Sequence, residues 1–404
     1  KFSIEFADYN RIGETWIHPF TVSNSKDEEM TGLTCHSQVP LDIYESHSDF
    51  INDNYILPNL RSNKYTEPDE QTENDDIRYV GYHIDAAKYA QLLKEESLKR
   101  PNLKLIDAHV ADIAVQNENI TSLVLNNSEI ITADIFVDCT GFRALLANAV
   151  GAEWDKSYSE RLFVDTALAV QLPYRDKSTQ MRNTTYCHAL QNGWVWNVPL
   201  QTRIGTGYVY SSRHTSEDDA RMEFKKHLNK MYGYNKEELK FRKLDFGVGI
   251  RPESWKNNVV AVGLSSFFLE PIESTAISTM HYQISTLYDM ITNDYILLKD
   301  KIKRFNSVNK MAVDAIASYI ELHYIMSKRT DSQFWKDVSS AKLTQVQKDT
   351  IELYLDPDRS FNRTTVDAVT GGHNIFDQSS FLFLYLGYDL LPNNVYSMVD
   401  RETL

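Results

Sequence analysis

Two short apolar segments that each end in glycine constrain the fold of this chain more than any other feature. The first, Ile135–Gly141, reads IFVDCTG, and the second, Val259–Gly263, reads VVAVG. A buried strand that ends in a small residue and glycine lets the backbone approach a ligand closely. In the second segment, a following helix that starts after Glu273 would add free N–H donors for an anionic or electron-rich group. Each segment is also compatible with an ordinary core strand and turn, so neither alone assigns a function.

The glycine fingerprint of dinucleotide-binding folds is missing from the sequence. That pattern, G-x-G-x-x-G, needs three glycines at the end of a strand. The segment Gly205–Gly207 has no third glycine and lies in a strand pattern, so we reject it. If the fold binds a dinucleotide, we expect the fingerprint upstream of Lys1, because the chain opens inside a predicted strand.

Composition excludes several classes of function. Hydrophobic residues make up 42% of the 404 residues and charged residues 24%, which is typical of a globular chain rather than a disordered one. The net charge of −14 would repel phosphate backbones and anionic lipids, so we exclude nucleic-acid binding as the main function. No apolar run approaches the roughly 18 residues of a membrane helix, and no signal peptide is visible. Three scattered cysteines (Cys35, Cys139, Cys187) predict no disulfide framework, no metal site and a reduced, cytoplasmic compartment.

Hydrophobic periodicity predicts strands first and helices last. Alternation in Lys1–Asp8 predicts a half-buried strand, and the spacing of apolar residues in Asp85–Arg100 predicts a helix. Further strands are predicted at 104–110, 113–116, 120–125, 129–132, 163–172, 193–199 and 205–210, further helices at 216–231 and 273–292, and mainly helix from 301 onward. This order predicts an α/β body at 1–295 and a helical C-terminal module at 296–404.

Several residues are candidates for chemistry, each with a plainer alternative. Glu273 follows the apolar run Phe267–Leu269, which would desolvate its carboxyl group and raise its pKa toward that of a general base. A single glutamate at this position is also typical of a solvated helix cap. Trp194 and Trp196 share one strand face, where such pairs are usually core residues. Lys1 would ordinarily be a surface lysine, and His18 would ordinarily be structural.

Taken together, these segments resemble the flavin-dependent halogenases of the tryptophan halogenase family. The matching segments, in family order, are 82–86 (YHIDA), 134–143 (DIFVDCTGFR), 193–199 (GWVWNVP), 207–212 (GYVYSS) and 268–275 (FLEPIEST). The opening Lys1–Phe6 and the triplet His18–Phe20 are similar to the family's catalytic-lysine strand and H-P-F segment, and 323–335 resembles a helix-loop segment of its C-terminal substrate module. The asparagine-, lysine- and tyrosine-rich composition suits a divergent, phage-type member or a low-GC source.

The resemblance implies a fold, cofactors and partners. The fold would be the FAD-binding, flavoprotein-monooxygenase-like (glutathione-reductase-type) α/β fold with mixed sheets. Reduced FAD and O₂ would oxidise a bound chloride, bromide or iodide to hypohalous acid. A separate flavin reductase would supply the reduced FAD, because no nicotinamide-binding pattern is present. The substrate would be an electron-rich aromatic or heteroaromatic compound rather than free tryptophan, and we expect a homo-oligomer.

The resemblance also implies residue roles. Lys1 would relay the oxidised halogen, and Glu273 and Ser274 would be catalytic, with Glu273 accepting the proton lost from the ring. Backbone N–H groups of Thr275 and Ala276 would hold the halide, although family members usually have glycine in place of Ala276. The residues expected at the flavin are Thr140, Gly141, Trp194, Trp196, Gly263, Leu264, Pro271 and Ile277. Those expected at the substrate are Ile4, His18, Pro19, Phe20, Phe334 and Trp335.

Two other functions stay open at this point. A flavin-dependent monooxygenase or hydroxylase of the same fold would not need Lys1 and Glu273 together. A non-catalytic binding protein would need neither. Glu5 departs from the family pattern, because many members carry a second basic residue there, so only Lys1 can fill the lysine role in this strand.

Overall fold

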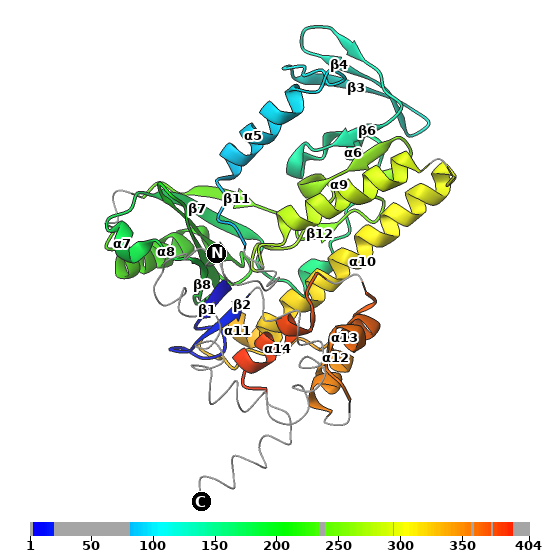
Figure 1. Ribbon diagram of the computed structural model, residues 1–404. Coiled ribbons are helices and arrows are strands. Elements are labelled where there is room, and N and C mark those ends of the chain that lie inside the picture. Colours follow the sequence, from blue (N-terminus) through cyan, green and yellow to red (C-terminus); the bar gives the residue numbers. More distant parts are fainter. Residues whose placement is uncertain are drawn as a thin grey trace, which may run out of the picture. The chain divides into compact units, whose positions relative to one another are not determined.

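The computed structural model describes residues 3–19, 81–234, 239–293, 295–356, 359–372 and 375–390 (Figure 1). Contacts divide the chain into two compact units, both discontinuous in sequence. The first unit comprises residues 1–83, 163–245 and 318–404, and the second unit comprises 84–162 and 246–317. The boundary predicted between residues 295 and 296 was drawn between a flavin-binding body and a substrate-binding module, and it stays a prediction.

A seven-stranded mixed sheet forms the centre of the first unit (Figure 1). Its strand order is β11-β7-β10-β9-β8-β1-β2, and among these described strands only β1 and β8 pair in parallel. The strands are β1 (Ser3–Ala7), β2 (Thr15–Pro19), β7 (Thr166–Leu172), β8 (Thr184–Ala189), β9 (Gly193–Pro199), β10 (Ile204–Tyr210) and β11 (Arg242–Asp245). Aromatic and β-branched residues dominate the central strands, as burial on a pleated surface favours.

Helix α8 (Glu217–Tyr232) covers one face of this sheet. Its side chains Phe224 and Leu228 are fully buried in a cluster with apolar residues of β7, β9 and β10. Each such side chain contributes about 1.5–3 kcal/mol of hydrophobic stabilisation. Ser216 caps the start of the helix, and Gly233, at a φ of 71°, ends it in the left-handed conformation that glycine adopts easily.

Aromatic side chains and C-terminal helices cover the opposite face. Phe6 stacks on Trp16 with ring centroids 4.4 Å apart and contacts His323 at 5.0 Å. Gly387 lies so close to Trp16 that a Cβ atom there would be 2.4 Å from the indole. The helices of this part of the chain are α10 (Leu298–Ile325), α11 (Gln333–Ser339), α12 (Gln345–Leu355), α13 (Arg363–Thr370) and α14 (Gln378–Gly387). The last residues of α10, from Ser318, belong to the first unit, as does the short helix α7 (Lys177–Gln180).

Small sheets and two packed helices build the second unit. Parallel strands β6 (Phe136–Asp138) and β14 (Val259–Ala261) lie beside β13 (Trp255–Lys256). An antiparallel meander follows the chain order of β3 (Val110–Gln116), β4 (Asn119–Leu125) and β5 (Ile130–Ile131), and β12 (Gly249–Ile250) pairs with β15 (Phe267–Phe268). The helices are α5 (Ala86–Leu98), α6 (Leu145–Ala149), α9 (Ala276–Thr292) and the 3₁₀ turns η1 (Gly141–Arg143), η2 (Ser157–Glu160) and η4 (Gly263–Ser265). Apolar side chains of α9 and of the first part of α10 pack against β13 and β14.

Most predicted elements are confirmed with small shifts at their ends. Strand β9 has the predicted bounds, and helix α5 begins directly after its predicted start at Asp85, whose carboxylate accepts a hydrogen bond from the Ala87 N–H. The strand predicted at 104–110 is wrong except for its last residue. Residues 104–109 are exposed or only partly buried, and among the described residues no strand pairs with them, so the apolar pattern there has neither a core nor a ladder.

Within the described part of the chain, no helix combines the length and apolar character that crossing a membrane requires. The same residues contain no cluster of three histidine, cysteine or acidic side chains that could hold a metal ion.

Candidate functional site

The first glycine turn of the second unit is organised by a buried carboxylate. Asp138, at the end of β6, is fully buried and accepts hydrogen bonds from Thr140 N (2.9 Å) and Thr140 Oγ1 (2.7 Å). The N–H groups of Leu146 (2.8 Å) and Ala147 (2.9 Å) donate to its other oxygen. Ser265, in η4, donates its hydroxyl to the same side chain at 3.2 Å. Asp138 therefore joins the strand end, the start of α6 and the second glycine turn.

Asp138 also replaces a missing helix cap. The residue at the N-cap of α6 is Ala144, at a φ of 41°, and its side chain has no oxygen that could bind the first N–H groups of the helix. The Asp138 carboxylate supplies this interaction from the neighbouring strand, where a negative charge also complements the helix dipole. Sequence analysis did not select Asp138, although it directly precedes the quoted Cys139–Gly141 turn.

Both glycine turns have the left-handed conformation that glycine tolerates. Gly141 has a φ of 71°, and a Cβ atom there would have no neighbour within 4 Å, so its face is open. Gly263 has a φ of 63°, and its N–H donates to Gln283 Oε1 of α9 at 2.9 Å. Beside the turns, the side chains of Phe142, Leu264 and Ile277 remain more than a third exposed. These three apolar side chains therefore border the backbone of the glycine turns, which a flat ligand can approach at Gly141.

A network of buried polar side chains holds the turn at Gly263 in place. Gln283 donates to Ser266 Oγ at 2.9 Å and to Asn309 Oδ1 of α10 at 2.7 Å. The buried guanidinium of Arg251 donates to the Ser265 carbonyl at 2.9 Å and to Asn148 Oδ1 at 2.6 Å. Burial lowers the pKa of Arg251, and the charge of nearby Asp138 opposes this shift. The network makes the turn rigid, because removing any one member would leave buried donors or acceptors unpaired.

Glu273 is a buried residue of the tight turn before helix α9. Its side chain is only 7% exposed, so the solvated-cap interpretation of this residue is wrong. The preceding Phe267 and Leu269 are buried as expected. The Ser274 N–H donates to the Pro271 carbonyl at 2.9 Å, and Ser274 has a φ of 56°, which is strained for a residue other than glycine.

The start of α9 presents free backbone donors. Thr275 is the N-cap, and its carbonyl accepts from the N–H of Thr279 at 2.9 Å and from the hydroxyl of Ser278 at 2.8 Å. The first-turn N–H groups, from Ala276 to Ser278, have no partner inside the helix. Ala276 and Ile277 are exposed, so an anion can reach these donors.

A second group of predicted residues shares one face of the large sheet in the first unit. Residues opposite each other in register point to the same side. Cys187 lies opposite Trp196, and β1 continues the same face with Ile4, which pairs with His18 of β2. Trp194 and Trp196 contact each other edge to face, with ring centroids 6.4 Å apart. The predicted common face of the two tryptophans is therefore confirmed.

The two tryptophans differ in their surroundings. Trp194 is fully buried, and its indole N–H has no hydrogen-bond acceptor among the described residues. Trp196 is half-buried and lies over Gly207 of β10, where a Cβ atom would be 2.1 Å from the indole Cη2. The absence of a side chain at Gly207 thus sets the position of Trp196.

The other predicted substrate residues have structural contacts. His18 is buried and its Nε2 lies 3.1 Å from the Ser380 hydroxyl of α14. Phe334 and Trp335 of α11 are fully buried, and the Trp335 indole N–H donates to the Leu190 carbonyl at 2.8 Å. These contacts fix His18, Phe334 and Trp335 in place within the first unit.

Two residues of the predicted site, Lys1 and Phe20, lie outside the described residues, and Pro19 is described only by its backbone at the end of β2. The second unit brings together Thr140, Gly141, Gly263, Leu264, Pro271, Glu273, Ser274, Thr275, Ala276 and Ile277. The first unit holds Ile4, His18, Trp194, Trp196, Phe334 and Trp335. The predicted site residues are therefore divided between the two units.

Comparison with known proteins identifies the fold and the family. The chain is 28% identical over 374 residues to tryptophan 7-halogenase RebH of Lentzea aerocolonigenes, covering 88% of this chain and 68% of that protein. It is 29% identical over 321 residues to tryptophan 6-halogenase ThaL of Streptomyces albogriseolus, covering 78% of this chain and 59% of that protein. The structure of Xcc4156, a flavin-dependent halogenase from Xanthomonas campestris, is similar with a TM-score of 0.81 and 28% identity, covering 97% of this chain and 75% of that one.

The fold is thus the mixed α/β fold of flavin-dependent halogenases, with a helical C-terminal region. The sequence model of the tryptophan halogenase family matches residues 1–403. The chain spans between about three fifths and two thirds of the length of the two relatives named above. It belongs to the tryptophan halogenase family of flavin-dependent enzymes.

Proposed function

We propose that this protein is a flavin-dependent halogenase that acts on an electron-rich aromatic or heteroaromatic compound. One observation carries the proposal: a buried carboxylate, Glu273, lies in a strained turn directly before a helix N-terminus, in the same unit as two glycine turns, of which the one at Gly141 faces open space. A carboxylate in such surroundings is suited to proton transfer, and free helix donors next to it are suited to a halide.

The residues of the second unit fit a flavin. Thr140, Gly141, Gly263 and Leu264 would hold it, because both glycines lack a Cβ atom and Gly141 faces open space. Pro271 and Ile277 would flank the same site. Reduced FAD would supply two electrons to O₂, and the halide would supply the other two, so that O₂ would be converted into hypohalous acid and water.

The start of helix α9 would hold the halide. Backbone N–H groups near Thr275 and Ala276 carry the positive end of the helix dipole and have no partner inside the helix. Ala276 carries a methyl group where family members usually have glycine. A bound halide would therefore have to reach the backbone N–H groups beside this methyl group. This arrangement accepts chloride, bromide or iodide.

Glu273 and Lys1 would transfer the halogen to the ring. The Lys1 amine is a strong donor and nucleophile on a flexible stem, which allows it to hydrogen-bond hypohalous acid or form a haloamine. Glu273 would then accept the proton that the ring loses when the carbon–halogen bond forms. Ser274 would hold the turn that aims Glu273. This step needs Lys1 and Glu273 to approach each other across a site closed to water.

The first unit would separate the flavin from the organic substrate. We propose that Trp194 and Trp196 form this wall, and that Ile4, His18, Pro19 and Phe20 border the substrate. The buried Phe334 and Trp335 would support this side. By their names, two relatives act on tryptophan; for this chain we propose an electron-rich aromatic or heteroaromatic compound other than free tryptophan. A separate flavin reductase, a homo-oligomeric state and a phage-type origin remain further expectations.

Paired variants of the full-length protein test the proposal. With a flavin reductase, NADH, bromide and an indole, we expect Lys1→Ala and Glu273→Gln to lose at least 100-fold in brominated product, since acid–base groups contribute about 10²–10⁴-fold. Peroxide release from reduced FAD should persist in both. Lys88→Ala and Glu153→Gln, which remove an exposed amine and an exposed carboxylate, should keep the wild-type rate. Hydroxylated product that persists in the Lys1 variant, with no halogenated product from wild type, would support the hydroxylase alternative instead.

A further inference from the structure

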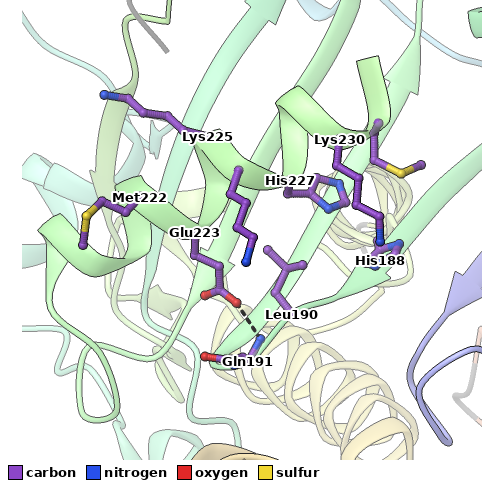
Figure 2. Close-up of a pocket in the computed structure, with 10 residues that line it drawn as sticks. His188, Leu190, Gln191, Met222, Glu223, Lys225, His227 and Lys230 are labelled. Atoms are coloured by element: carbon purple, nitrogen blue, oxygen red, sulfur yellow. Dashed lines mark hydrogen bonds between the residues drawn. The ribbon is translucent and has the colours of Figure 1, made fainter. Parts of the chain in front are cut away.

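A separate surface pocket in the first unit is lined by residues that have no role in the site proposed above. A surface pocket of about 590 Å³ opens between helix α8 and the turn that joins β8 to β9 (Figure 2). Lysines 225, 226 and 230 lie at this pocket, with His227 of the same helix and His188 of β8. Leu190, Met222 and Met231 add apolar walls.

The floor of the pocket is held in place by three segments of the chain. The Leu190 carbonyl accepts from the Trp335 indole at 2.8 Å, and the Gln191 carbonyl accepts from the Ser332 hydroxyl at 2.5 Å. The Gln191 N–H donates to Glu223 Oε1 of α8 at 2.9 Å, as the dashed line in Figure 2 marks. The pocket is therefore preformed rather than a gap between mobile side chains.

The pocket carries unneutralised positive charge on a chain whose net charge is −14. Within the described residues, Lys225, Lys226 and Lys230 form no ion pair. The acid in the lining, Glu223, already accepts from Gln191 N–H and, at 2.7 Å, from the Tyr208 hydroxyl. The three lysines outnumber the single acid of the lining, Glu223, and this excess of positive charge attracts anions.

A buried histidine adds an unused polar group. His227 is 7% exposed and lines the pocket, yet its ring forms no hydrogen bond within the described part of the chain. Its ring lies 4.8 Å from that of His188, whose Nε2 is 3.1 Å from Asp8 Oδ2. Burial lowers the pKa of His227 to about 3, with smaller contributions from His188 and Lys230 that Asp8 opposes. His227 is thus neutral at pH 7 and presents one donor and one acceptor.

We propose that this pocket binds a small organic phosphate. A phosphate monoester carries about −1.5 to −2 charges at pH 7 and three acceptor oxygens, which matches several lysines and a histidine N–H better than a carboxylate does. Met222, Met231 and Leu190 would contact the apolar part of the ester. The site is independent of halogenation and involves no covalent step.

Calorimetric titration of the full-length protein with phenyl phosphate tests the site. The matched pair of double variants is Lys226→Met with Lys230→Met, and Lys299→Met with Lys303→Met as the control. Both pairs remove two exposed lysines spaced four apart on a helix, so the net charge changes equally. We expect the pocket variant to bind at least tenfold more weakly than wild type and the control to bind within twofold of it.

Three further measurements decide the details. Inorganic phosphate and phenol should each bind at least tenfold more weakly than phenyl phosphate, because each lacks one half of the ligand. Phenyl phosphate should shift the ring NMR signals of His227 and leave those of exposed His109 unchanged. His227→Phe should weaken binding while leaving the fold, checked by circular dichroism, intact. Equal affinity in both double variants, no binding at millimolar phenyl phosphate, or an unshifted His227 signal would overturn the proposal.

Discussion

Replacing Gly207 by alanine tests how strand β10 positions Trp196. The new Cβ atom would lie 2.1 Å from Cη2 and 2.3 Å from Cζ2 of the indole, well inside van der Waals contact. The indole must therefore rotate or the strands must separate. Gly205→Ala is the matched control on the same strand, because its nearest neighbour, the Val198 carbonyl oxygen, would be 3.8 Å away.

The magnitude follows from the packing. Adding a methyl group to an occupied space costs about 1–3 kcal/mol, and the contact with Trp196 is close enough that we expect about 2 kcal/mol for Gly207→Ala. The control Gly205→Ala lowers the conformational entropy of the unfolded chain, and its new Cβ atom makes no close contact. Its free energy of unfolding should therefore stay within about 0.5–1 kcal/mol of wild type or exceed it.

Urea denaturation, followed by far-UV circular dichroism and by tryptophan fluorescence, measures the difference. The native fluorescence maximum of the Gly207→Ala protein should also shift, because Trp196 moves while the control leaves it in place. Since we propose that Trp196 separates flavin from substrate, the same variant should release more peroxide per halogenated product. Equal stability and equal fluorescence for the two variants would refute this account of the β9–β10 pair.

Two further predictions concern buried titratable groups. Asp138→Asn should lower the free energy of unfolding by about 2–4 kcal/mol relative to Asp134→Asn, because the amide nitrogen cannot accept from donors such as Leu146 N–H; equal urea midpoints would contradict this. Folding lowers the pKa of His227 from its ordinary value of 6.5 to about 3, so between these values the unfolded state binds more protons and stability falls as the pH drops. Wild type and an exposed-site control, His109→Gln, should each lose about 1.2 kcal/mol between pH 6 and pH 5 from this group, whereas His227→Leu should not. The same pH slope in all three proteins would show that His227 is not held neutral.

Local features of the fold could be predicted where the residues of a single segment were sufficient to indicate the element. The alternation and aromatic content of 193–199 predicted β9 with its observed bounds, and Asp85 predicted the start of α5. The segment 104–109 shows the limit of this approach. Its pattern is compatible with a strand, but the strand needs a partner, and pairing is a property of the whole fold.

The site was predictable only in its motif-bearing parts. The turns at Gly141 and Gly263 and the carboxylate of Glu273 lie within short recognisable segments. Asp138 was missed because the partners that it joins beyond its own turn lie 8, 9 and 127 residues further along the chain. The phosphate pocket was missed for the same reason, since it forms only when α8 packs beside the β8–β9 turn. Buried polar groups that unite distant segments leave no periodic signal in the sequence.

Mass spectrometry of the product tests the central claim most directly. The full-length protein would be incubated with FAD, a flavin reductase, NADH, O₂ and equimolar chloride and bromide, against a panel of indoles, phenols and other electron-rich rings. The account predicts a product in which one ring hydrogen is replaced by halogen, with the isotope pattern of chlorine or bromine, and no such product from Glu273→Gln. A product that has gained only one oxygen atom, or halogenation that is unchanged in Glu273→Gln, would contradict it.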